Sequence, residues 1–168
     1  MDINERFEFR QVEPSEADQV TEIEKICFPP NEACSSKDMY ERTQYANDVF
    51  LVAADKDTGK IAGFLNGLAT NESRFRDEFF TDITLHDPRG ENVLLTGLDV
   101  LPAYRRQGLA REIVRQYEIR EREKGRKRLI LTCLPEKIAM YESFGFRNLG
   151  LSASKWGGEA WYEMVYEL

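Results

Sequence analysis

The segment from Val93 to Tyr117 most constrains the fold, because an apolar strand, a glycine-containing turn and a helix follow one another directly. The strand ends near Leu101, and Leu109, Ile113 and Tyr117 have helical apolar spacing. This order points the unpaired N–H groups of the first helical turn, and the positive end of the helix dipole, at one place. The sequence therefore predicts a site for an anion, above all a pyrophosphate.

The turn itself supports an anion site. Gly108 has no side chain, so backbone can approach a ligand closely, and Arg105, Arg106 and Arg111 add positive charge. The pattern is neither GxGxxG nor a P-loop, which would end in Lys-Ser/Thr. On these residues alone, the alternative is an ordinary strand-to-helix turn with arginines on its surface.

Length and composition limit the class of protein. A chain of 168 residues fits one domain, residues 1–168. The net charge of −7 argues against nucleic acid or an anionic membrane as partner and is compatible with a cationic substrate. No signal peptide or spanning segment is expected. Three cysteines without zinc spacing predict reduced thiols and a cytoplasmic protein, and the single histidine, His86, argues against a multi-histidine metal site.

The pattern along the chain predicts an α/β (mixed α+β) fold, with a mixed sheet and helices on both faces. The expected strands are near residues 7–12, 49–54, 61–68, 92–101 and 129–134, followed by two last strands joined by a hairpin turn at Gly157-Gly158. The expected helices start at Ser15, with Asp18 completing a capping box, at Ser35 and at Gln107, and one runs from Pro135 to about Phe144; a short helix and a loop are expected in 71–90.

Two motifs carry a resemblance to a known family. Arg105–Ala110 has the form Arg/Gln-x-x-Gly-x-Gly/Ala after a strand reading Leu-x-Val-x-Pro, which resembles motif A of the GNAT (Gcn5-related) N-acetyltransferases. Tyr141 before Gly145-Phe146 resembles their motif B. Looser matches at both ends, such as Phe9-Arg10 and Trp161–Met164, resemble the arylalkylamine (serotonin-type) group, and the resemblance covers about residues 7 to 165.

The resemblance implies the GNAT acyl-CoA N-acyltransferase fold, with about seven strands, and acetyl-CoA as cosubstrate. It implies that the backbone of the central strand binds the acetyl and pantetheine groups, and that the loop binds the diphosphate. The implied cofactor-binding residues are Leu98, Asp99, Val100, Arg105, Arg106, Gln107, Gly108, Leu109, Ala110 and Arg111. The Leu98 backbone would stabilise the oxyanion, and Tyr141 would protonate the leaving thiolate. The acceptor would contact Phe28, Glu159 and Trp161.

The general base is not evident. The two histidines that relay the proton in the arylalkylamine group fall at Leu94 and Thr96, so that base is absent and Thr96 can at most hold a water molecule. Glu91 and Asp99 are the candidate replacements, with Glu32 and Glu159 as more distant ones. Glu159 stands where the group has leucine, and its carboxylate can pair with a second positive charge on the acceptor. This leaves polyamines or protein N-termini open as acceptors.

The sequence thus predicts an N-acetyltransferase that transfers acetyl from acetyl-CoA directly to a primary amine, a small (aryl)alkylamine. Two alternatives stay open: acetylation of a peptide or protein N-terminus or lysine, and a non-catalytic acyl-CoA-binding regulatory module. The expected protein is a monomer or homodimer.

Overall fold

The computed structural model describes residues 2–168, which form one seven-stranded sheet with the order β1-β2-β3-β4-β5-β7-β6. Within these residues, only β4 and β5 pair in parallel; the other pairs are antiparallel. The strands are β1 (Phe7–Gln11), β2 (Leu51–Asp55), β3 (Ile61–Thr70), β4 (Asn92–Val100), β5 (Arg128–Cys133), β6 (Arg147–Leu151) and β7 (Tyr162–Glu167).

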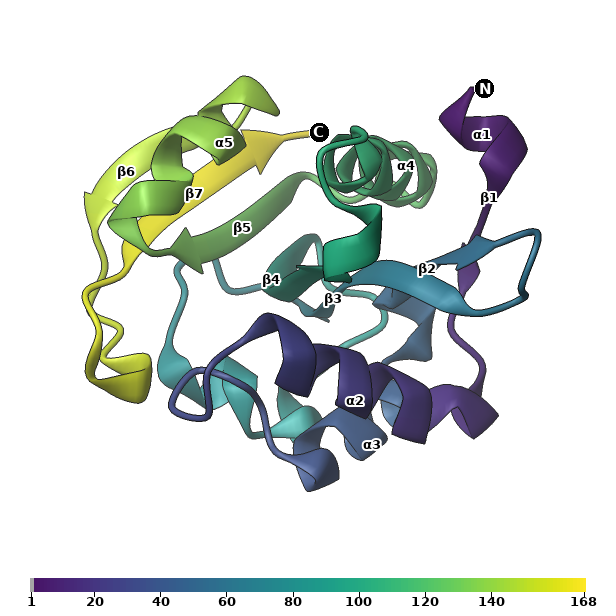
Figure 1. Cartoon of the computed structure of the whole chain (residues 1–168). Helices are drawn as coiled ribbons and strands as arrows, with labels where there is room; N and C mark the ends of the chain where they lie inside the picture. Colours follow the sequence, from purple (N-terminus) through teal and green to yellow (C-terminus); the bar gives the residue numbers. More distant parts are fainter. Residues whose placement is uncertain (1) are drawn as a thin grey trace.

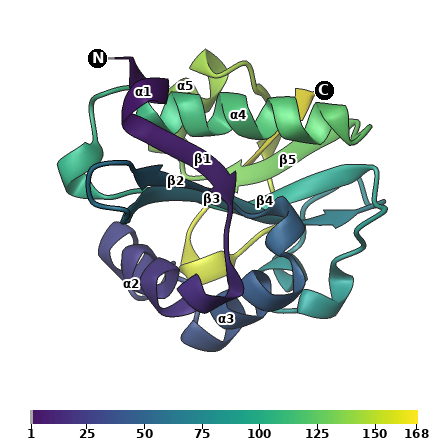
Figure 2. The ribbon, with the colours of Figure 1, turned by 90° about the vertical axis from the view of Figure 1, so that its right-hand side faces the viewer.

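Helices cover both faces of the sheet, as predicted (Figures 1 and 2). Helices α2 (Ala17–Cys27) and α3 (Ser36–Tyr45) lie side by side on one face. Helices α4 (Leu109–Glu123) and α5 (Ile138–Ser143) lie on the other, with the one-turn helix α1 (Ile3–Arg6) near the start of α4. The mixed sheet and its two helical layers confirm the predicted fold class.

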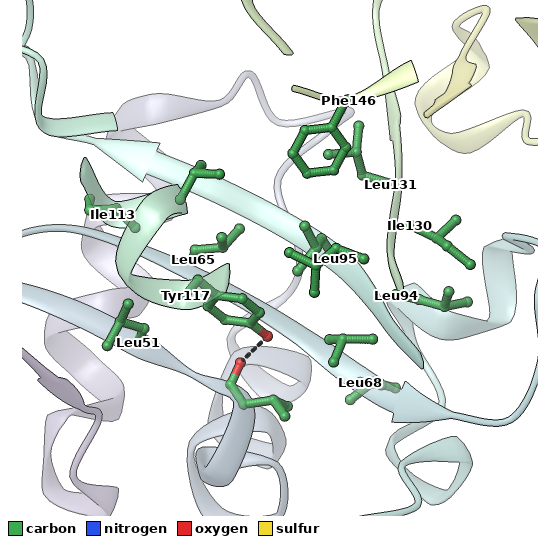
Figure 3. Close-up of a cluster of buried hydrophobic side chains, with 14 of the residues drawn as sticks. Leu51, Leu65, Leu68, Leu94, Leu95, Ile113, Tyr117, Ile130, Leu131 and Phe146 are labelled. Carbon is green, nitrogen blue, oxygen red and sulfur yellow. Dashed lines mark hydrogen bonds between the residues drawn. The ribbon is translucent and has the colours of Figure 1, made fainter. Parts of the chain in front are cut away.

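Helix α4 is held on the sheet by its apolar face. Ile113 and Tyr117 are one turn apart and point into a cluster that includes Leu51, Leu65 and Leu95 (Figure 3). The Tyr117 hydroxyl donates a 2.7 Å hydrogen bond to the carbonyl of Val49, so the polar group of this buried side chain has a partner. The packing fixes the N-terminus of α4, where the anion site is predicted.

Three local predictions were wrong, and one short helix was not predicted. The helix expected in 71–90 is instead two 3-10 turns, Asp77–Phe80 and Ile83–Leu85, where the buried Phe79 and Phe80 hold the chain on the sheet. The capping box predicted from Ser15 and Asp18 is not formed. Glu13 and Glu16 form a capping box instead, because a 3-10 turn at Pro14–Glu16 precedes α2.

The third wrong prediction concerns the C-terminal hairpin, and the helix that was not predicted lies at the N-terminus. Gly157-Gly158 does not join the last strands tightly: it lies in a 3-10 turn within the ten-residue connection 152–161, which packs against other loops. The α1 turn was not expected at all; it begins at Asp2, whose carboxylate accepts from the Asn4 N–H.

Candidate active site

A cleft opens where β4 and β5 separate. The two strands pair only from Asn92 to Leu94 and from Arg128 to Ile130, and beyond this point each continues without the other. The cleft, of about 670 Å³, is lined by residues after that point, including Thr96–Leu98 and Leu131–Leu134. Its size suits a small molecule. On the cleft side, the β4 backbone from Leu95 onwards lacks a strand partner and is available to a ligand.

A β-bulge shapes the floor of the cleft. In the pairing of β3 with β4, Asn66 lies opposite Gly97 while Gly67 lies opposite Leu95, so Thr96 is the extra residue. The bulge expected near Gly97 is therefore present, one residue earlier. The Thr96 hydroxyl donates a 2.6 Å hydrogen bond to the side-chain oxygen of Asn66.

The loop before α4 has the backbone geometry that an anion cradle requires. Arg106 has a φ of 63° and Gly108 a φ of 82°, so the chain coils tightly there. Within the described residues, the backbone N–H groups from Arg106 to Arg111 donate to no protein acceptor. A Cβ placed on Gly108 would meet nothing within 4 Å, so the space before the helix is open. Free amides, an open approach and the helix dipole together fit the diphosphate of coenzyme A.

The arginines of this loop have different surroundings. Arg105 donates from Nε to the Val100 carbonyl at 2.8 Å and so ties the loop to the end of β4. Arg111 donates to the Ser143 carbonyl at 3.0 Å and stacks on Phe144, with 5.0 Å from its guanidinium carbon to the ring centre. Arg106 makes no such bond in residues 2–168 and lines the cleft, so its charge is available to an anion.

Tyr141 lies in the wall of the cleft. Its ring packs edge-on against Phe144 and Phe146, at centroid distances of 6.1 and 5.6 Å. Burial, and then the nearby Cys133 and Asp99, raise the pKa of the Tyr141 phenol, which keeps it protonated. The described residues offer its hydroxyl no hydrogen-bond partner. Tyr141 therefore carries a proton into the cleft.

Aromatic rings line another part of the same cleft. Phe28, Phe80, Trp156 and Trp161 all contribute, and the rings of Phe80 and Trp156 stack at 4.6 Å. The Trp156 indole donates to the Glu32 carbonyl at 2.8 Å, and the Trp161 indole to the Trp156 carbonyl at 2.8 Å. The first of these bonds joins the loop after α2 to the 152–161 connection, so the two segments hold each other in place.

Carboxylates border this aromatic wall. Glu32 and Glu136 line the cleft. Burial, and then repulsion from Glu159 and Glu136, raise the pKa of the Glu32 carboxyl. Glu32, with the carboxylates of Glu136 and Glu159 near it, favours a positively charged neighbour.

Most of the predicted site residues line the cleft, but four do not. Glu91 lies at the other end of β4, where it pairs with Lys127 at 2.9 Å; the ion pair lowers the pKa of Glu91, so it is no candidate base. Glu159 is exposed beside the cleft rather than in its lining. The side-chain oxygen of Gln107 accepts from Arg6 at 2.6 Å. The side chain of Asp99 is buried and points away from the cleft, as strand alternation requires. Only its backbone can contact the cosubstrate.

The residues brought together as predicted are Phe28, Thr96, Leu98, Val100, Arg105, Arg106, Gly108, Leu109, Ala110, Arg111, Tyr141 and Trp161. Three polar residues at or beside the cleft were not expected from the sequence: Glu24, Arg42 and Asn66. Glu24 lines the cleft from α2, and Arg42 donates to the Asn66 oxygen at 3.3 Å. The available signal was polarity on a buried face: Glu24 shares the apolar stripe of Val20 and Ile23, and Asn66 interrupts an otherwise apolar strand.

The family profile of the acetyltransferase (GNAT) family matches residues 17–146, and the chain belongs to this family. The fold and the cleft define an acyltransferase that uses acetyl-CoA as its cosubstrate. No curated protein sequence matches the chain.

Three solved structures with the same fold are each 18% identical to this chain in sequence. The GNAT-like decarboxylase GphF in complex with isobutyryl-CoA has a TM-score of 0.78, over 95% of this chain and 98% of that one. The ribosomal-protein-S18-alanine N-acetyltransferase from Escherichia coli has a TM-score of 0.67, over 96% and 93%. The phosphinothricin acetyltransferase from Sinorhizobium meliloti in complex with AcCoA also has 0.67, over 97% and 89%.

Among residues 2–168, no helix has the length and apolar character needed to cross a membrane.

Proposed function

We propose that this acetyltransferase transfers the acetyl group of acetyl-CoA directly to a small primary amine with an apolar or aromatic body, of the alkylamine or arylalkylamine class. One observation carries the proposal: a single cleft is lined both by the anion cradle and by an aromatic wall with Glu32 and Glu136. The cradle suits the diphosphate of the cosubstrate. The aromatic and acidic wall suits an organic cation.

Each part of the cleft then has a role in binding or in catalysis. When bound, acetyl-CoA supplies the thioester that is attacked. The amides of residues 106–111 hold its diphosphate, and Arg106 adds charge. Backbone N–H groups in Leu98–Val100, on the side of β4 that lacks a strand partner, donate to the carbonyl oxygen as negative charge develops there. Tyr141 gives its proton to the departing thiolate.

The thiols in the cleft support direct transfer without an acetylated cysteine. Burial raises the pKa of Cys133 to about 11, and burial also raises the pKa of Cys27. A thiol that stays protonated is a poor nucleophile. We therefore infer that the amine nitrogen attacks the thioester itself.

The test measures release of CoA from acetyl-CoA with a panel of alkylamines, arylalkylamines, diamines and N-terminal and lysine peptides. We expect turnover with the small amines, and Glu32→Gln to raise KM for cationic acceptors about tenfold while KM for acetyl-CoA is unchanged. Glu123→Gln, at the far end of α4, is the matched control.

Two outcomes would overturn the proposal. Turnover with peptides but not with small amines would replace the small acceptor by a protein. Tight binding of acetyl-CoA without turnover on any acceptor would indicate a regulatory acyl-CoA-binding module.

A further inference from the structure

Arg42 on α3 is a buried arginine behind the floor of the cleft, and it forms no ion pair with a carboxylate of the described residues. It is 2% exposed, and its guanidinium donates to two neutral oxygens: the Asn66 side chain at 3.3 Å and the Phe80 carbonyl at 2.8 Å. The other buried arginine of these residues, Arg126, pairs with Glu121 at 3.0 Å. Burying a guanidinium without an acidic partner is costly, so the position of Arg42 calls for an explanation.

Arg42 reaches the cleft through Asn66. The side-chain oxygen of Asn66 also accepts from the Thr96 hydroxyl at 2.6 Å, and its amide nitrogen donates to the Gly97 carbonyl at 3.3 Å. A threonine hydroxyl can bond either end of an amide, because it both donates and accepts, whereas a guanidinium only donates. Arg42 is therefore the group that requires the oxygen of Asn66 on this side and turns the amide nitrogen towards Gly97.

The Gly97 carbonyl belongs to the same peptide group as the Leu98 N–H, and in a trans peptide these two bonds point in opposite directions. Leu101, just beyond the end of β4, donates from its N–H to the Ala62 carbonyl beside β3 at 2.9 Å. Hydrogen-bonding groups alternate along an antiparallel strand, so Gly97 directs its carbonyl towards β3 and Leu98 directs its N–H towards the cleft. A hydrogen bond that holds the Gly97 carbonyl therefore also sets the direction of the Leu98 N–H.

The second bond of Arg42 joins this arrangement to the aromatic wall. The Phe80 carbonyl accepts from the guanidinium, and the Phe80 ring stacks on Trp156 with their centroids 4.6 Å apart. A guanidinium is a rigid planar fork, so its two bonds fix the Phe80 backbone relative to the Asn66 amide. One buried side chain thus holds both the bulge on the floor of the cleft and the start of its aromatic wall.

We propose that Arg42 is a positioning residue for acetyl transfer: through Asn66 it holds the Gly97–Leu98 peptide so that the Leu98 N–H points at the thioester carbonyl oxygen. The inference rests on the proposed function, in which this N–H is a donor to that oxygen. Negative charge gathers on the oxygen as the amine adds to the thioester carbon, and a donor displaced by about 1 Å stabilises that charge far less. Arg42 itself contacts neither the cosubstrate nor the amine.

The kinetic test uses Arg42→Met and Asn66→Asp. The aspartate has the shape of asparagine and still accepts from Arg42 and Thr96, but it replaces the donor to the Gly97 carbonyl by an acceptor. Arg126→Met is the matched control, since this arginine is also buried but bonds the loop before β4, away from the bulge. We expect kcat to fall about 10²-fold in both test variants, with wild-type affinity for acetyl-CoA by calorimetry. Arg126→Met should lower Tm and keep kcat.

A second measurement needs neither an acceptor nor turnover. Infrared difference spectra of bound acetyl-CoA, labelled with carbon-13 at the carbonyl, report the hydrogen bond to the thioester oxygen. The carbonyl band should move to lower frequency on binding to the wild type and to Arg126→Met, and should move less in Arg42→Met and Asn66→Asp. If Arg42→Met does not fold, Asn66→Asp decides alone. A wild-type band shift or wild-type kcat in Asn66→Asp would overturn this inference and leave the proposed function intact. Absence of turnover with every acceptor would overturn the proposed function, and the infrared comparison would still decide the role of Arg42.

Discussion

Thr96 and Asn66 are joined by a 2.6 Å hydrogen bond in which the threonine hydroxyl is the donor. Arg42 donates to the same amide oxygen, and the Asn66 amide nitrogen donates to the Gly97 carbonyl at 3.3 Å. The single hydroxyl hydrogen of Thr96 is therefore committed, and only its lone pairs are free to face the cleft. Thr96 can accept a hydrogen bond from an amine or a water molecule but cannot donate one.

Thr96→Val should remove this acceptor without changing the shape of the side chain. We expect kcat/KM for the amine to fall about tenfold, the cost of about one hydrogen bond, while acetyl-CoA affinity is unchanged. Thr96→Ser keeps the hydroxyl and should retain near wild-type kcat/KM. Full activity in Thr96→Val would remove Thr96 from the site.

Gly108→Ala tests the anion cradle. Gly108 has a φ of 82° and Gly125 a φ of 84°, and a Cβ at either position would meet nothing within 4 Å. Both alanine variants should lose about 1–2 kcal/mol of stability, the cost of alanine in the left-handed conformation. Only Gly108→Ala should also weaken acetyl-CoA binding by calorimetry, by about tenfold or more, because its methyl stands where the diphosphate approaches. Equal affinities for both variants would show that the diphosphate lies elsewhere.

Phenylalanine substitutions at Tyr141 and Tyr117 distinguish a hydroxyl that acts in the reaction from one that stabilises the fold. Tyr141→Phe deletes a hydroxyl without a protein partner, so Tm should hold while kcat falls about 10²-fold. Tyr117→Phe deletes the bond to Val49, so stability should fall by about 1 kcal/mol while kcat holds. Thermal unfolding and steady-state kinetics on both variants check the contrast. A Tyr141→Phe enzyme with an unaltered pH–rate profile would not need the phenol as its acid.

The hydrogen bonds of Glu112 predict that the free energy of unfolding decreases in acid. It accepts from Arg115 at 2.7 and 2.9 Å and from Asn4 and Gln116, and these bonds, Arg115 first, lower its pKa to about 2. Because the folded pKa is below the unfolded value of about 4.3, this stabilisation is fully present above that value and is lost as the pH falls towards 2.

Glu112→Gln should therefore cost about 1–3 kcal/mol at pH 7, and its difference from wild type should shrink as the pH falls through 4 to 2. Urea unfolding across that pH range gives the curve. A constant difference at every pH would mean that the charge of Glu112 contributes no stability.

The sequence was informative wherever a local rule sufficed. The position of Gly108, after a strand and before Leu109, was enough to predict the turn in front of α4. Hydrophobic periodicity predicted the ends of α2 and α4 to within two residues. Asn66 illustrates what a local rule cannot reveal, because its partners Arg42 and Thr96 lie far along the chain. Glu91 shows the converse: its place next to β4 suggested chemistry, but the direction of the strand puts it at the far end, beside Lys127.

The aromatic wall of the cleft is built from two segments, 28–34 and 152–161, that are far apart in the chain but in contact with each other. The Asn31 amide donates to the Gly157 carbonyl at 3.0 Å, and a Cβ on Gly157 would come within 2.5 Å of the Asn31 carbonyl oxygen. A change of length or conformation in one segment would therefore disturb these contacts with the other. The two loops thus form one structural unit, and an engineer who grafts one of them from a relative would have to transplant its companion as well.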